Sequence, residues 1–168
     1  KDISNSLNWA LKELGFSEVS ELLIRSHVGS GVFPLIRNVL KEASPDHQIP
    51  QDGILERAIS LYRSYYSDHL LDETKLYPGV KTVLDFFKEK KQAVITNKSV
   101  EFSHRILKGL GIDHYFFEVI GEDQKLPKKP APDSVLKLLQ LTKVNPNEAI
   151  LIGDSMIDIQ TAKNAKIK

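Results

Sequence analysis

The sequence predicts an α/β protein with two parts, an all-helical unit over residues 1–75 and a parallel-sheet unit over residues 76–168. The first part shows only the spacing of apolar residues that is typical of helices. The second part contains three short apolar runs, which alternate with longer stretches of helical periodicity. Such alternation is typical of βαβ units, in which parallel strands lie side by side and helices cover the sheet.

Four helices are expected in the first part, over residues 1–14, 17–27, 32–42 and 54–71. Gly15 follows the first periodic stretch and is a typical helix stop. Gly29, Ser30 and Gly31 form a glycine-rich turn before the third helix. Residues 43–53 are rich in Pro, Asp and Gly and predict a loop.

In the second part, the turn residues Tyr77, Pro78 and Gly79 mark the change of character. Strands are expected at residues 92–96, 115–121 and 149–152, and helices at residues 80–90, 100–110, 133–143 and 156–166. Asp133 is expected to cap the start of the third of these helices.

Composition narrows the classes of partner. The 168 residues are 41% hydrophobic and 27% charged, which suits a globular protein with a real core. The net charge is +1, from 23 basic and 22 acidic residues without a basic stripe, so nucleic acid is not expected as a partner. The absence of cysteine excludes disulfides and thiol chemistry. No apolar run approaches the roughly 20 residues of a membrane span, so a membrane is not expected as a partner. We expect a cytoplasmic protein that is a monomer or a homodimer.

Polar residues follow the first and third expected strands. Thr96 and Asn97 come after the first strand, and Asp154 and Asp158 come after the third. In an open α/β sheet, ligands bind beyond the carboxyl ends of the strands. A helix start after Thr96 and Asn97 favours anions. Two carboxylates suit Mg²⁺, which also takes phosphate oxygens.

A lysine loop lies between these two sets in the chain. The stretch KKPAPD carries Lys128 and Lys129, and its prolines stiffen the loop and restrict where a lysine points. A lysine, two acids, a hydroxyl and an amide together predict a phosphate site.

The stretches VITNKS, KKPAPD and ILIGDSMIDIQTAKNA, in this order, resemble the second, third and fourth motifs of the haloacid dehalogenase superfamily of phosphohydrolases. The helical unit ahead of them resembles the cap of that superfamily, so the resemblance covers nearly the whole chain. It implies a Rossmann-like parallel sheet core with an all-helical cap. Within the superfamily, HVGSGVFPLI, YPGV and KPAPD look most like the phosphoglycolate phosphatases. The resemblance then implies Mg²⁺-dependent hydrolysis of a small phosphorylated metabolite, 2-phosphoglycolate, to glycolate and phosphate through an aspartyl-phosphate intermediate.

The resemblance also implies roles for individual residues. Thr96 and Lys129 would be catalytic, and both would bind the phosphoryl group together with Asn97. Asp154 and Asp158 would hold Mg²⁺ directly or through water. The cap residues Gly29, Ser30 and Gly31 would lie at the face that closes over the substrate.

The sequence departs from the family pattern at its first motif. The family nucleophile is an aspartate of a DxDGT-type motif, which is not found here, and Asp2 does not follow an apolar strand. We therefore expect the sequence to be part of a longer chain and to lack the first and last core strands. This part alone is expected to be inactive.

Alternative interpretations remain open at this point. A related sugar-phosphate mutase, a pyrophosphatase or a non-catalytic truncated relative would fit the same motifs. Asp154 and Asp158 could serve only as a helix cap and a first-turn acid, and Thr96 and Asn97 only as a strand-to-helix cap. Lys129 could be a solvated lysine, and the glycine-rich segment only a turn between helices.

Overall fold

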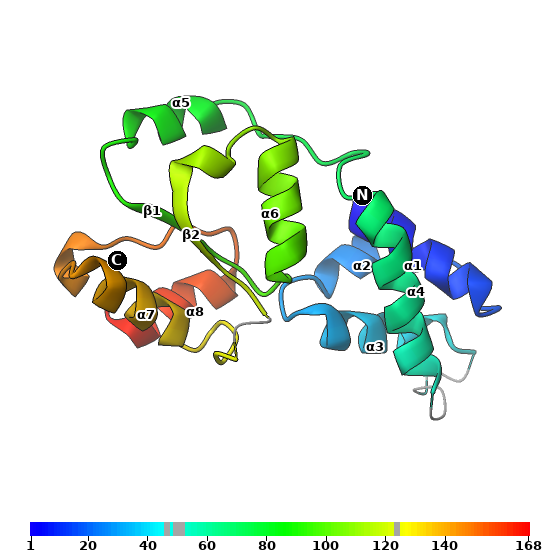
Figure 1. Ribbon diagram of the computed structural model, residues 1–168. Coiled ribbons are helices and arrows are strands. Elements are labelled where there is room, and N and C mark those ends of the chain that lie inside the picture. The colour runs from blue at the N-terminus through cyan, green and yellow to red at the C-terminus, as the bar shows by residue number, and fades with distance from the viewer. Residues whose placement is uncertain (46–47, 49–52, 123–124) are drawn as a thin grey trace. The chain divides into compact units, whose positions relative to one another are not determined.

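The computed structural model describes residues 1–45, 48, 53–122 and 125–168. These residues form two compact units, Lys1–Lys75 and Leu76–Lys168 (Figure 1). The first unit contains α1 (Asp2–Glu13), α2 (Glu21–Ser26), α3 (Val32–Ala43) and α4 (Ile54–Asp68). Most of the loop predicted at residues 43–53 lies outside the described residues.

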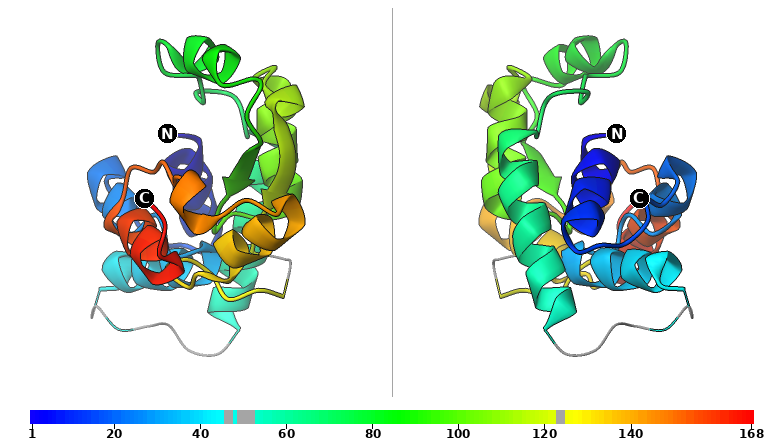
Figure 2. Two further views of the ribbon diagram at one scale, coloured as in Figure 1. Left: turned by 90° about the vertical axis from the view of Figure 1, so that its left-hand side faces the viewer. Right: turned by 90° about the vertical axis from the view of Figure 1, so that its right-hand side faces the viewer.

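The helices of the first unit enclose an apolar core. Helix α4 packs against α1 and α3 (Figures 1 and 2). The side chains between them are almost fully buried, among them Leu7, Leu11, Ile36, Val39, Leu40 and Tyr62. They recur at three- and four-residue intervals because this spacing keeps them on one face of each helix.

An asparagine fixes the connection between α1 and α2. Asn8 Nδ2 donates to Val19 O at 3.0 Å, and Asn8 Oδ1 accepts from Val19 N at 2.9 Å. One amide side chain thereby satisfies both backbone groups of Val19, which is buried. Backbone groups away from water need such partners when no regular ladder supplies them.

A buried aspartate joins the beginning of the first unit to its end. The side chain of Asp2 accepts hydrogen bonds from Glu73 N at 2.9 Å, Thr74 N at 2.9 Å and Thr74 Oγ1 at 2.7 Å. Asp2 is only 3% exposed. Its carboxylate therefore has a structural task that the sequence pattern did not indicate.

Replacing Asp2 with alanine is expected to lower the free energy of unfolding by about 3 kcal/mol, because three donors lose a charged acceptor. Urea denaturation of the variant and the parent measures this change. Asp2→Asn, which keeps one oxygen acceptor, is expected to cost less than Asp2→Ala. Equal stability of Asp2→Ala and the parent would contradict the assigned role.

The second unit is built on two parallel strands. Its elements are α5 (Val80–Phe86), β1 (Gln92–Ile95), α6 (Val100–Gly109), β2 (Phe116–Ile120), α7 (Asp133–Thr142) and α8 (Met156–Ala165), with short 3-10 turns at Asp113–Tyr115 and Pro146–Glu148. Gln92 pairs with Phe116 and Ile95 with Ile120, with one irregularity after Gln92. Helix α6 packs on β2, and α7 packs on both β1 and α8. The α/β fold class with a helical unit ahead of it is confirmed.

Several local predictions differ from the structure. The helix predicted at residues 17–27 begins only at Glu21. Residues 149–152 do not form a strand: in this stretch Ala149 N donates to Pro146 O and Leu151 N donates to Lys168 O, whereas a strand requires a full ladder with a neighbouring strand. Helix α5 ends at Phe86, short of the predicted residue 90, and the side chain of Gln92 donates to the carbonyls of Leu84 and Phe87 at this end. Asp133 is the first helical residue of α7, and the cap position is taken by Pro132, which makes no side-chain cap hydrogen bond.

Within the described ranges, no helix has the length and apolar character that crossing a membrane would require.

Candidate active site

The segment after β1 continues the strand by one hydrogen bond and then turns into α6. Thr96 N donates to Ile120 O at 2.9 Å, and Thr96 Oγ1 accepts from Lys98 N at 3.1 Å. Ser99 is the residue that caps α6, since its Oγ accepts from Phe102 N at 3.3 Å. Thr96 and Asn97 are therefore not the helix cap, which removes one of the structural alternatives for this pair.

The close approach of β2 to this turn depends on a glycine. A Cβ at Gly121 would lie 2.5 Å from Lys98 O and 2.9 Å from Val100 N. Glu122 N, the next residue, donates to the same Lys98 oxygen at 3.0 Å. Gly121 thus permits the end of β2 to pack directly on the turn that carries the candidate phosphate-binding residues.

Asn97 holds the backbone of Lys129. Asn97 Oδ1 accepts from Lys129 N at 3.0 Å, and Asn97 Nδ2 donates to Lys129 O at 3.1 Å. The asparagine is 7% exposed. Its side-chain amide therefore faces the lysine loop, and a contact of Asn97 with a phosphoryl group stays a prediction.

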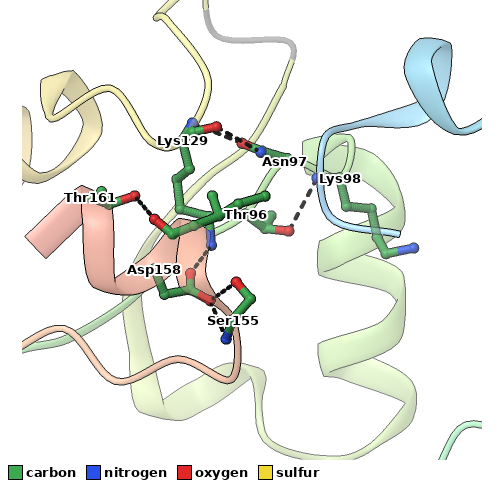
Figure 3. A network of polar contacts seen from close by, with 8 residues as sticks. Thr96, Asn97, Lys98, Lys129, Ser155, Asp158 and Thr161 are labelled. Atoms are coloured by element: carbon green, nitrogen blue, oxygen red, sulfur yellow. Dashed lines mark hydrogen bonds and ion pairs between the residues drawn. The ribbon is translucent and has the colours of Figure 1, made fainter. Parts of the chain in front are cut away.

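Lys129 in turn contacts the acidic motif. Its Nζ lies 2.6 Å from Asp158 Oδ1, and the two side chains are only 14% and 9% exposed. Figure 3 shows Thr96, Asn97, Lys129 and Asp158 gathered around this ion pair. The structure thus brings together four of the predicted site residues, which come from three separate stretches of the sequence. Lys129 is not a solvated lysine.

Asp158 also binds the start of α8. Its Oδ2 accepts from Ser155 Oγ at 2.5 Å and from Ser155 N at 3.2 Å. Burial raises the pKa of the Asp158 carboxyl, but the hydrogen bonds from Lys129 and Ser155 and the lysine charge outweigh it, so the net pKa lies below its usual value. Asp158 is therefore a helix-capping acid and the lysine partner at the same time. Ser155 was not predicted, although a serine at a helix start is the signal that could have indicated it.

Asp154 has a different environment. Its side chain is exposed, at the turn between the extended segment and α8. Among the described residues, no group of three or more histidines and acids is assembled to hold a metal. Two carboxylates nevertheless suit Mg²⁺, which keeps waters and takes phosphate oxygens for its remaining positions. The oxygen donors at this site fit Mg²⁺. Asp154 offers an exposed carboxylate, whereas the carboxylate of Asp158 is already engaged by Lys129 and Ser155.

Gly29, Ser30 and Gly31 lie in the first unit, at the turn before α3. Gly29 has a φ of 129° and Gly31 a φ of 98°, which is the region that favours glycine. Gly31 is the residue that immediately precedes α3. A role of these three residues toward a substrate stays a prediction.

The profile of haloacid dehalogenase-like hydrolases matches residues 1–168. The chain belongs to this family. It is 35% identical over 170 residues to the phosphoglycolate phosphatase of Aquifex aeolicus, with 100% of this chain and 75% of that protein covered. It is 32% identical over 170 residues to the phosphoglycolate phosphatase of Pseudomonas putida, covering 99% of this chain and 61% of the relative.

Solved structures show the same fold. A predicted phosphoglycolate phosphatase from Haemophilus somnus 129pt superimposes with a TM-score of 0.90 at 29% identity, covering 99% of this chain and 75% of that one. A haloacid dehalogenase-like hydrolase from Streptococcus pneumoniae superimposes with a TM-score of 0.80 at 24% identity, covering 99% of this chain and 74% of that one. This similarity supports the fold alone. The predicted family is thereby confirmed, and the chain is a hydrolase whose matched relatives carry the name phosphatase.

Proposed function

We propose that this haloacid dehalogenase-like hydrolase is a Mg²⁺-dependent phosphatase that converts 2-phosphoglycolate to glycolate and phosphate. The observation that carries the proposal is Lys129, whose backbone is held by Asn97 and whose ammonium pairs with Asp158 close to Thr96 (Figure 3). A fixed cation next to a hydroxyl, at the carboxyl end of a parallel strand, suits an oxyanion with several negative oxygens. The names of the relatives support 2-phosphoglycolate among the possible phosphate esters.

Each residue contributes to charge neutralisation or to positioning. Thr96 Oγ donates to a phosphoryl oxygen, and Lys129 Nζ balances the charge that spreads over the transferring group. Asp154 and Asp158 would hold Mg²⁺, and the oxygens of Asp158 also accept hydrogen bonds from Lys129 and Ser155. The metal, when bound, neutralises and orients phosphate oxygens.

The proposed route passes through an aspartyl-phosphate, so it requires a carboxylate nucleophile. Asp2 does not fill this role because Glu73 and Thr74 engage its oxygens. The resemblance implies that the nucleophilic carboxylate is an aspartate of a DxDGT-type motif. Gly29, Ser30 and Gly31 are proposed to line the substrate side of the cap. The protein is proposed to act in the cytoplasm as a monomer or homodimer.

Asp154→Asn in the natural gene product is expected to reduce Mg²⁺-dependent phosphate release from 2-phosphoglycolate at least about 100-fold, because a metal loses its exposed carboxylate ligand. Phosphate release is followed with Mg²⁺ and with EDTA. Asp113→Asn changes an exposed acid of the same unit and is expected to retain parent activity.

Parent-like turnover by Asp154→Asn would refute the metal assignment. Isomerisation of a sugar phosphate without phosphate release would refute the substrate and favour a mutase, and faster phosphate release from pyrophosphate than from 2-phosphoglycolate would favour a pyrophosphatase. Neither phosphate release nor isomerisation with any of these compounds would favour a non-catalytic relative.

A further inference from the structure

We propose that Asn97 is a positioning residue for Lys129, which acts by holding the lysine backbone in place instead of contacting the phosphoryl group. The inference rests on the proposed function for its catalytic meaning. Asn97, Lys129 and Asp158 all lie within the second unit.

Both polar atoms of the Asn97 amide are used on one residue. Oδ1 accepts the Lys129 N–H at 3.0 Å, and Nδ2 donates to the Lys129 carbonyl at 3.1 Å. These two groups belong to the peptide planes on either side of the Lys129 Cα. Because both planes are held, the backbone at this residue cannot rotate without breaking a hydrogen bond, and the direction in which the side chain leaves is set.

The direction matters because the lysine side chain is long and flexible. Its ammonium reaches Asp158 at 2.6 Å only if its Cα stays at the right distance and angle. Misplacing a catalytic group by about 1 Å costs roughly 100-fold in rate. Asn97 thus supplies the fixed end of the side chain, and Asp158 supplies the partner at its free end.

Neighbouring contacts hold the same loop less completely. Lys128 pairs with Glu122, and Asn164 Nδ2 donates to Pro130 O at 2.8 Å. Asn164 is exposed to solvent, and Lys128 contacts Glu122 through its side chain, which leaves its backbone outside that contact. These contacts restrain the residues on either side, whereas Asn97 is 7% exposed and engages the lysine backbone itself.

The first unit contains a matched control for the clamp. Asn8 makes the same pair of hydrogen bonds to the backbone of Val19, at 3.0 and 2.9 Å. Asn8→Ala removes an equivalent clamp where no candidate site residue is held. A comparison of Asn97→Ala with Asn8→Ala therefore separates the positioning of Lys129 from the general loss of two hydrogen bonds.

The experiment is chemical acylation of lysines in the natural gene product, quantified for each lysine by peptide mass spectrometry. A lysine that is buried and ion-paired reacts slowly, so the labelling rate of Lys129 reports how often it leaves Asp158. Asn97→Ala is expected to raise this rate about tenfold, since two hydrogen bonds are lost. Asn97→Asp keeps the acceptor for Lys129 N–H and is expected to give a smaller rise. Asn8→Ala is expected to leave the rate unchanged.

Hydrogen exchange of the β2 peptide in the same samples distinguishes local release from general unfolding, because Val119 and Ile120 are buried there. An unchanged Lys129 rate in Asn97→Ala, or a rise matched by equally faster exchange in β2, overturns the proposal. If Asn97→Ala does not fold, the labelling rate of Lys129 and the hydrogen exchange of the β2 peptide in Asn97→Asp decide instead.

Steady-state kinetics with 2-phosphoglycolate complete the test. Asn97→Ala is expected to lower kcat about 100-fold, and Asn8→Ala is expected to leave kcat at the parent value. Faster labelling with unchanged kcat overturns the positioning role. If the parent hydrolyses no phosphate ester, the proposed function fails, and the labelling comparison still decides whether Asn97 fixes Lys129.

Discussion

Asp158→Asn is expected to lower the free energy of unfolding by about 3 kcal/mol at pH 7, because it removes one partner of a largely buried ion pair. The Lys129 ammonium, 14% exposed and 2.6 Å from the carboxylate, would keep its charge without a counter-ion. The asparagine amide also presents only one acceptor oxygen to Lys129 and to the two donors of Ser155. Turnover is expected to fall at least about 100-fold, since the lysine loses its fixed position.

The pH dependence of stability provides a second measurement on this variant. The pKa of Asp158 is lowered in the folded protein, so the carboxylate stabilises the fold above its unfolded pKa of about 3.9. This contribution is lost as the pH falls through the lower, folded pKa. The parent is therefore expected to lose stability steeply below about pH 4. The free energy of unfolding of Asp158→Asn is expected to fall less than that of the parent over the same pH range.

Asp154→Asn is the matched control, because it makes the same substitution at an exposed acid of the same motif. Its free energy of unfolding is expected to stay within about 0.5 kcal/mol of the parent. Urea denaturation from pH 3 to 7, in EDTA, compares the three proteins. The buried ion pair would be refuted if the parent and Asp158→Asn had equal free energies of unfolding at pH 7. It would also be refuted if their free energies of unfolding changed equally with pH.

Gly153→Ala is expected to disrupt the same site by steric conflict. An added Cβ would lie 2.3 Å from both Cβ and Cγ of Asp158 and 2.6 Å from its Oδ2. Because Asp158 is held by Lys129 and Ser155, it cannot move away without breaking those contacts. We expect a loss of about 3 kcal/mol in the free energy of unfolding, at the upper end for overpacking, and a loss of turnover like that of Asp158→Asn.

Gly15→Ala controls for the substitution itself. A Cβ at Gly15 meets nothing within 4 Å, but its φ of 79° is unfavourable for alanine. Strain alone is expected to cost about 1 kcal/mol there and to leave turnover unchanged. Urea denaturation and phosphate release are measured for both variants. If Gly153→Ala is no more harmful than Gly15→Ala, the close approach of Gly153 to Asp158 is wrong.

Much of the second unit was predictable because its signals are local. The apolar run at 92–96 and the helical spacing after it correspond to β1 and α6. The expected strand at 149–152 was wrong since an apolar run shows only that a segment can form a strand. A ladder partner decides whether it does, and Ile150 and Ile152 are 69% and 77% exposed in this structure.

The residue types of the candidate site were likewise visible in the motifs, but their partners were not. Asn97 precedes Lys129 by 32 residues, and Lys129 precedes Asp158 by 29. No periodicity or local spacing encodes contacts over such separations. The resemblance therefore indicated candidate residues, and it did not indicate that the side chain of Asn97 bonds the lysine backbone.

The sequence by itself determined the α/β class and the family, and it singled out the residues that are proposed to carry the chemistry. Periodicity, turn residues and motif order are properties of neighbouring positions and survive without a fold. The tertiary structure decided that Asn97 clamps Lys129, that Lys129 pairs with Asp158, and that Gly153 must lack a side chain. These facts depend on which distant backbones and charges pack together, because burial and close approach arise only when the chain has folded.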